Sequence, residues 1–207
     1  MPALCVMVSG GGSNLQTLID ACESGEIGAR IALVVSSKEG VYALERAKNH
    51  GIPTRVIPPK AYETRDAFED AVISALQENK IDYIVLAGYL SILGQKVVSR
   101  YPNRIVNIHP ALIPSFCGKG YYGERVHSAV LEYGAKVSGA TVHFVDEGTD
   151  TGPIILQETV PVLDDDDAHT LAARVLEKEH KLLPAAVKLL VEGRLKIEGR
   201  RVKIVES

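Results

Sequence analysis

The sequence has few cysteines, no long apolar run and no excess of basic residues, and each absence narrows what the chain can be. Cys5, Cys22 and Cys117 are odd in number and form no Cys-x-x-Cys pair, which disfavours a disulfide framework or a zinc site. We therefore expect a reducing, cytoplasmic compartment. No apolar run approaches the roughly 18 residues that a membrane-spanning helix needs, and no basic leader precedes the first apolar segment. Secretion and membrane insertion are both disfavoured.

The charged residues are balanced and dispersed. The chain has 23 Lys and Arg against 26 Asp and Glu, a net charge of −3 over 207 residues, with no basic stripe. Nucleic-acid binding as the main activity is therefore disfavoured, and small molecules are the expected partners. The composition, 46% hydrophobic and 24% charged, is typical of a globular domain. No linker divides the chain, so we expect a single domain over residues 1–207.

Strand and helix patterns alternate along the first half of the chain. Short apolar runs predict strands at 3–9, 29–36, 54–57, 83–87 and 104–109. Amphipathic segments between them predict helices at 15–25, 41–50, 65–77 and 94–101. This order predicts an α/β fold with a mostly parallel, Rossmann-like open sheet and helices on both faces.

The alternation breaks at residues 113–124, a loop rich in glycine. The remaining pattern predicts a helix at 126–133, a strand pair at 137–145 and 154–162, a helix at 168–191 and a terminal hairpin at 195–204. We expect the strand pair to form an antiparallel edge of the sheet. Pro184 is expected to kink or restart the last helix.

Asn107 and His109 stand two residues apart in the strand predicted at 104–109. Side chains at this spacing point to the same face of an extended chain. Pro110 ends the strand, which places the ring at the carboxyl edge, where ligands bind in open α/β sheets. Either residue alone is also compatible with a hydrogen-bonded place in the core. Together they favour a catalytic pair, an amide and a titratable ring that polarise one oxygen atom.

The segment 9–14, Ser-Gly-Gly-Gly-Ser-Asn, joins a predicted buried strand to the start of a helix. Backbone N–H groups at such a place can hold a phosphate. Leu15 stands where a dinucleotide fingerprint needs its third glycine, and no Gly-Lys-Ser/Thr follows, so neither common nucleotide motif is favoured. A simple turn capped by Ser13 or Asn14 is the alternative. Three glycines exceed what a turn needs, so we favour a monophosphate cradle.

A second polar loop, 146–153, follows the strand predicted at 137–145. Turn chemistry explains Asp146 equally well. Asp150 is a candidate to approach His109, where its carboxylate would favour the imidazolium and orient a proton-carrying water. Other polar residues have simpler explanations, as a solvated helical position for Glu179, a surface charge for Arg65, and structural roles for His127 and His143.

Several stretches together resemble the formyltransferases that use 10-formyltetrahydrofolate: 9–15, 107–116, 141–145, 149–157 and Glu179-His180. The resemblance covers nearly the whole chain and is strongest to the members that formylate glycinamide ribonucleotide in purine biosynthesis. Its Asn-x-His-Pro motif with a later Asp is shared with methionyl-tRNA formyltransferase and formyltetrahydrofolate hydrolase. Those enzymes usually carry an additional domain, for which this chain has no room.

The resemblance implies transfer of a formyl group from the co-substrate 10-formyltetrahydrofolate to the amine of glycinamide ribonucleotide, with no metal. It makes Asn107, His109 and Asp150 the catalytic trio, in which Asn107 and a protonated His109 stabilise an oxyanion and Asp150 supports the proton relay. It places the ribonucleotide phosphate against Gly11, Gly12, Ser13 and Asn14, and its amino end against Glu179. It places the folate beside Arg65, Leu90, Ser91, Ile92, Leu93 and Asp146.

The resemblance also implies a division of labour, with phosphate binding in residues 1–100 and catalysis with folate binding in residues 101–207. Two stretches depart from the family pattern. Ser91 stands where bacterial members often have arginine, and the segment 117–123 is longer than usual. A formyltetrahydrofolate hydrolase and a non-catalytic folate- or nucleotide-binding module remain the alternatives. The expected assembly is a monomer or a homodimer.

Overall fold

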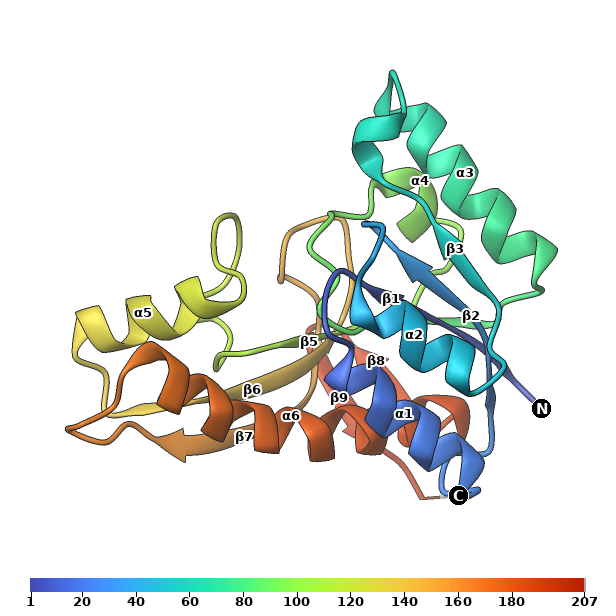
Figure 1. Ribbon diagram of the computed structural model, residues 1–207. Helices are drawn as coiled ribbons and strands as arrows, with labels where there is room; N and C mark the ends of the chain where they lie inside the picture. Colours follow the sequence, from blue (N-terminus) through green and yellow to red (C-terminus); the bar gives the residue numbers. More distant parts are fainter. Residues whose placement is uncertain (207) are drawn as a thin grey trace.

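A nine-stranded sheet organises the computed structural model, which describes residues 1–206 (Figure 1). Its strands are β1 (Ala3–Val8), β2 (Arg30–Ser36), β3 (Thr54–Val56), β4 (Tyr83–Leu86), β5 (Ile105–His109), β6 (Val137–Phe144), β7 (Ile154–Pro161), β8 (Leu195–Glu198) and β9 (Arg201–Ile204). Its helices are α1 (Ser13–Glu23), α2 (Tyr42–Asn49), α3 (Arg65–Glu78), α4 (Gln95–Val98), α5 (Glu124–Tyr133) and α6 (Ala168–Val191), with one 3₁₀ turn, η1 (Pro59–Ala61).

The strand order is β3-β2-β1-β4-β5-β6-β7-β9-β8. Strands β1 to β5 are parallel to one another, whereas β6 is antiparallel to both β5 and β7. The predicted mostly parallel open sheet is therefore confirmed. The predicted antiparallel pairing of β6 with β7 on this side of the sheet is confirmed as well, and the terminal hairpin extends the edge, because β9 pairs with β7 and β8 lies outermost. The terminal hairpin covers backbone groups that β7 would otherwise leave unpaired.

Helices cover both faces of the sheet, as the alternating pattern predicts. One apolar cluster joins the β1 residue Val6 to Leu15 of α1 and Leu183 of α6. A second cluster joins Met7 of the same strand to Leu76 of α3 and also includes residues of α4. All six residues of β1 are buried, which explains why this strand shows no alternation of apolar and polar residues.

The last helix, α6, runs uninterrupted from Ala168 to Val191 with Pro184 buried inside it, so the proline does not restart the helix. Asp167 caps its first turn by accepting a hydrogen bond from the Thr170 N–H. Figure 1 shows α6 lying beside α1, against which it packs. Within residues 1–206, no helix is long and apolar enough to cross a membrane.

The connections place the functional loops at one edge of the sheet. From β1 the chain moves outward through β2 and β3, then returns to β4 and β5 on the other side of β1. The carboxyl ends of β1 and β4 therefore flank the point where the winding direction reverses, the usual ligand site in open α/β sheets. The glycine turn after β1, the segment after β4 and the end of β5 all gather at this point.

Candidate active site

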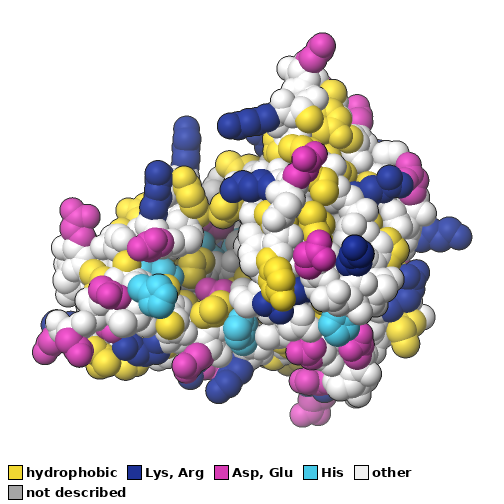
Figure 2. All heavy atoms as spheres, in the orientation of Figure 1, with side chains coloured by type: hydrophobic (Ala, Val, Ile, Leu, Met, Phe, Trp, Pro, Cys, Tyr) yellow, Lys and Arg dark blue, Asp and Glu magenta, His cyan; other side chains and the backbone are white. Residues whose placement is uncertain are grey.

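A cavity of about 830 Å³ opens at this edge of the sheet. The loops after β1, β4 and β5 line it, together with residues 118–124, residues 148–150 and part of α6. Figure 2 shows the hollow between the part of the molecule that carries α5 and the part that carries α2. A cavity of this size accommodates a small organic substrate.

The register between β5 and β6 brings four polar side chains together. Asn107 lies opposite His143, and His109 lies opposite Thr141. Residues directly opposite one another in an antiparallel pair point to the same face. His109, His143 and Thr141 are all buried, at 4%, 1% and 0% exposure. This face of the β5–β6 pair is therefore a polar floor inside an otherwise apolar sheet.

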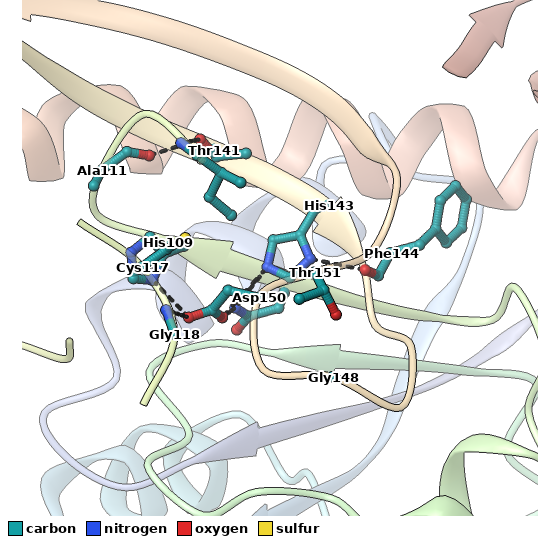
Figure 3. A network of polar contacts seen from close by, with 12 residues as sticks. His109, Ala111, Cys117, Gly118, Thr141, His143, Phe144, Gly148, Asp150 and Thr151 are labelled. Atoms are coloured by element: carbon teal, nitrogen blue, oxygen red, sulfur yellow. Dashed lines mark hydrogen bonds and ion pairs between the residues drawn. The ribbon is translucent and has the colours of Figure 1, made fainter. Parts of the chain in front are cut away.

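Asp150 reaches this floor from the loop after β6 (Figure 3). Its Oδ2 lies 3.7 Å from the His109 Nδ1 and accepts a 2.9 Å hydrogen bond from the Gly118 N–H, and its Oδ1 lies 3.4 Å from the Asn107 Nδ2. The backbone of Asp150 is left-handed, with φ of 58°, a conformation that aspartate tolerates better than most residues. The structure thus brings together Asn107, His109 and Asp150, the trio expected from the sequence.

The ring of His109 is held by a main-chain oxygen. Its Nε2 lies 2.9 Å from the carbonyl oxygen of Phe116, which can only accept, so Nε2 carries a proton. Burial lowers the pKa of His109, and the nearby Asp150 charge opposes this effect without overcoming it. The resting ring is therefore neutral near pH 7, because the loss of solvation outweighs the ion pair. The protonated His109 that the resemblance implies for catalysis stays a prediction. The single N–H of the neutral ring is donated to Phe116, so the ring can donate to a ligand only after Nδ1 gains a proton.

The carboxylate of Asp150 is ionised at neutral pH. Burial acts to raise its pKa, but the His143 and His109 rings and the Gly118 N–H together hold the pKa below its usual value. A neutral imidazole and an ionised carboxylate therefore face each other across the cavity floor.

His143 lies in the site, although only a structural role was expected for it from the sequence. Its Nδ1 lies 2.7 Å from the Phe144 carbonyl oxygen and must donate to it, so in the neutral ring Nε2 is an acceptor. That acceptor lies 3.1 Å from the Asn107 Nδ2, which donates to it. His143 thereby determines which end of the Asn107 amide points toward Asp150. The signal in the sequence was a pair of polar residues, Thr141 and His143, in an otherwise apolar strand.

The glycine turn leads directly into α1. Gly12 is the residue before the helix, with φ of 72°, and no side chain caps it within the described chain, so the alternative of a cap by Ser13 or Asn14 is not realised. A Cβ at Gly12 would lie 2.6 Å from the Ala43 Cβ. A Cβ at Gly11 would meet nothing within 4 Å. The turn therefore packs on α2 at Gly12 and borders open space at Gly11.

Glu179 is buried, at 9% exposure, although a solvated position was the default expectation. Its Oε2 accepts a 2.6 Å hydrogen bond from the Nδ2 of Asn14, and burial raises its pKa. Glu179 also lines the cavity, whereas Gly11, Gly12, Ser13 and Asn14 lie just beyond the lining. The bond to Asn14 places Glu179 at the glycine-turn end of the cavity.

Known proteins share this architecture. Residues 3–187 match the family model described as formyl transferase. The chain belongs to the formyl transferase family.

Individual family members resemble the chain over nearly its full length. A phosphoribosylglycinamide formyltransferase from Haemophilus influenzae is 41% identical over 96% of this chain and 91% of its own length. The chloroplastic enzyme of that name from Arabidopsis thaliana is 41% identical over 99% of this chain and 70% of its own length. The structure of glycinamide ribonucleotide transformylase 1 from Symbiobacterium toebii superimposes with a TM-score of 0.94 at 45% identity, covering 100% of this chain and 95% of that one.

A family member with a different name has a similar fold. The structure of a formyltetrahydrofolate deformylase from Pseudomonas syringae matches with a TM-score of 0.89 but at 26% identity, covering 99% of this chain and 66% of that one. The fold alone therefore does not separate transfer from hydrolysis.

In this formyl transferase family member, the residues expected to border folate divide into two groups. Leu90, Ser91, Ile92 and Leu93 line the cavity, and Leu90 and Ile92 are half exposed to it. Arg65 and Asp146 are not among the lining residues. The Arg65 Nε bonds the buried Glu69 carboxylate at 2.8 Å, and Asp146 accepts from the Gly148 N–H, as turn chemistry explains. The geometry therefore gives these two residues no support as folate contacts.

The buried histidines predict how stability depends on pH. Burial lowers the pKa of His109 and of His127, whereas histidines in the unfolded chain titrate near pH 6.5. Below about pH 6.5 the unfolded chain therefore binds more protons than the folded one, and the free energy of unfolding falls as the pH is lowered. Above about pH 7 these histidines are neutral in both the folded and the unfolded chain, so their contribution to the free energy of unfolding no longer changes with pH. Each such histidine adds at most about 1.4 kcal/mol per pH unit.

Urea unfolding between pH 5.5 and 7.5 measures this dependence. The variant His127→Gln should flatten it, because one titrating group is removed from both states. An equally steep dependence in the variant and the parent chain would contradict the assignment.

Proposed function

We propose that this chain transfers a formyl group from 10-formyltetrahydrofolate to the amine of glycinamide ribonucleotide, a step of purine biosynthesis. The observation that carries the proposal is the meeting of Asn107, His109 and Asp150 in one cavity whose other end reaches Glu179. The names of two similar proteins, a phosphoribosylglycinamide formyltransferase and a glycinamide ribonucleotide transformylase, support formyl transfer to glycinamide ribonucleotide.

The amine of the ribonucleotide attacks the formyl carbon, and the formyl oxygen gains negative charge. Two donors on the cavity floor serve this oxygen, the Asn107 Nδ2 and, once it is protonated, the Nδ1–H of the His109 ring, whose Nε2–H stays bonded to Phe116. The Asn107 amide keeps its 3.1 Å bond to His143, and its second N–H, whose contact with Asp150 is a long 3.4 Å, is available to an oxyanion placed beside that carboxylate. Preorganised donors of this kind typically contribute about 10²–10³-fold each to the rate.

Asp150 is proposed to transfer the proton between the amine and the folate. The attacking nitrogen must lose a proton for the tetrahedral intermediate to collapse, and the leaving N10 of the folate must gain one. The ionised Asp150 carboxylate accepts the proton from the amine and, with the His109 ring beside it, returns one proton to N10 as the C–N bond to the folate breaks, which leaves the carboxylate ionised again. All of these roles belong to side chains of this chain.

The ends of the substrates are assigned from the lining of the cavity and from the glycine turn just beyond it. The phosphate is assigned to the N–H groups of Gly11, Gly12, Ser13 and Asn14, because the start of a helix favours an anion. Glu179 bonds Asn14 beside this turn, so we assign it to the ribose next to the phosphate rather than to the amino end. The exposed apolar Leu90 and Ile92 are assigned to the flat folate ring system.

The site is expected to work on small molecules in the cytoplasm, in a monomer or homodimer. Cys5, Cys22 and Cys117 are all free, which suits a reducing compartment. The chloroplastic relative shows that family members also work in other compartments.

Incubation with both substrates tests the proposal. We expect deformylated folate to form only when glycinamide ribonucleotide and 10-formyltetrahydrofolate are both present. Release of formate without the ribonucleotide would support the hydrolase instead. Binding of either compound without turnover would support a non-catalytic module.

Filling the open space at Gly11 gives a second test. In Gly11→Val the side chain meets no protein atom within 4 Å of its Cβ, so the chain should fold normally. The added methyl groups would occupy the expected phosphate position, and we expect the KM for the ribonucleotide to rise at least about tenfold, the loss of a charge-assisted hydrogen bond. The KM for the folate should change little. Equal rises in both values would count against the phosphate assignment.

A further inference from the structure

Two carbonyl groups of the glycine turn are held by helix α2. The Gly10 carbonyl oxygen accepts a 3.2 Å hydrogen bond from the Ala43 N–H, and the Gly11 carbonyl oxygen accepts a 2.9 Å hydrogen bond from the Arg46 Nε. Figure 1 shows α2 beside the start of α1, and the two helices are in contact. The turn is therefore bound to α2 through its oxygen atoms.

These two bonds determine the direction of the neighbouring N–H groups. The Gly10–Gly11 and Gly11–Gly12 peptide bonds are trans, so each N–H points away from the carbonyl of the same peptide. Because both carbonyls point to α2, the N–H groups of Gly11 and Gly12 point to the opposite side. A Cβ at Gly10 or Gly11 would meet nothing within 4 Å, so the turn also borders open space.

The guanidinium of Arg46 is fixed before any ligand binds. Its Nη1 donates to the Gln16 Oε1 at 3.1 Å, and its plane lies over the Tyr42 ring at 4.8 Å from the ring centre. The first turn of α1 carries no acidic residue, so the positive charge of Arg46 is not neutralised there. An arginine held in this way loses little conformational freedom when it supports a ligand site.

An independent observation indicates that a ligand with a hydrogen-bond donor, such as a ribose hydroxyl next to the phosphate, belongs beside this turn. Asn14, in the first turn of α1, is only 7% exposed, and its Oδ1 has no hydrogen-bond partner within residues 1–206. Its Nδ2 is bound to Glu179, a residue of the cavity lining. A buried acceptor without a partner costs free energy unless a ligand donates to it.

We propose that Arg46 is a positioning residue for the phosphate of the substrate, because it holds the Gly11–Gly12 peptide so that the Gly12 N–H faces the phosphate monoester. Arg46 acts through this peptide and does not touch the reacting atoms. This inference rests on the proposed function for the identity of the substrate. The phosphate monoester that it concerns can be tested without formyl transfer.

The experiment compares the full chain with Arg46→Met, Arg46→Lys and Lys48→Met. Lys48 is an exposed cation on the same helix, so its variant controls for the loss of a positive charge. Ribose 5-phosphate serves as the probe, and its titration is followed through the backbone amide signals of Gly11 and Gly12. The KM values for glycinamide ribonucleotide and for 10-formyltetrahydrofolate are measured in parallel.

We expect Arg46→Met to weaken ribose 5-phosphate binding about tenfold, the loss of one charge-assisted hydrogen bond, and to shift the Gly12 amide signal in the free protein. The KM for the ribonucleotide should rise by a similar factor, while the KM for the folate stays within twofold. Arg46→Lys, which keeps a donor, should recover part of the affinity. Lys48→Met should behave like the parent chain.

Unchanged phosphate affinity in Arg46→Met would overturn the proposal, as would an equal loss in Lys48→Met or an equal loss of folate affinity. The role of Arg46 and the proposed formyl transfer can be tested separately. Normal formyl transfer with no effect of Arg46→Met would refute the role of Arg46 alone. Arg46-dependent binding of ribose 5-phosphate without any formyl transfer would refute the proposed function and leave the role of Arg46 standing.

Discussion

Replacing Asp150 by asparagine should lower kcat by about 10²–10⁴-fold, the range that a positioned acid–base group contributes. Asparagine tolerates the left-handed backbone at this position and keeps an oxygen that can accept from the Gly118 N–H, so the loop should keep its shape. The change then removes only the charge that accepts the amine proton. Steady-state kinetics with saturating substrates measure the effect.

A second measurement separates this role from a structural one. The charge of Asp150 acts to raise the pKa of His109, so in Asp150→Asn the pKa of that ring should fall further, which NMR titration detects. Asp146→Asn is the matched control, because Asp146 lies in the same loop but outside the cavity lining. A kcat for Asp150→Asn within threefold of the parent chain would remove Asp150 from the mechanism.

Truncation of His109 to alanine should lower kcat by about 10²–10³-fold with a smaller change in either KM, as expected for the loss of one oxyanion donor. The Phe116 carbonyl loses its partner in this variant, so the melting temperature must be measured alongside the kinetics. His109→Gln, which restores an N–H donor, should recover part of the lost rate.

The control for this variant is His169→Ala. His169 is an exposed histidine that also borders the cavity, so its removal tests whether any histidine at this surface affects turnover. Turnover of His109→Ala at the parent rate would refute the assigned role. Equal losses in the two variants would point to a general effect of the cavity charge.

Much of the fold was predictable because its signals are local. The apolar run of β1 and the 3.6-residue pattern of α1 depend on residues that are close in the chain, so periodicity alone indicated each element. The pairing of β7 with β9 was not predictable in this way. It depends on which unpaired strand the terminal hairpin can reach, and only the fully assembled sheet shows that.

The candidate site shows the same division. The sequence by itself determined that Asn107 and His109 share one face at a strand end, since an extended chain alternates its side chains and Pro110 stops it. It also indicated a special turn before α1 through the run of glycines. The fold shows one reason for them, since an added Cβ at Gly12 would collide with Ala43.

Only the tertiary structure decided which distant groups meet these residues. The register of β6 against β5 placed His143 beside Asn107, and the fold of the following loop carried Asp150 to His109. Asn14 and Glu179, which are 165 positions apart, bond directly because α6 packs on α1. Burial then lowered the pKa of His109. Desolvation depends on every surrounding element, and no local pattern of residues records it.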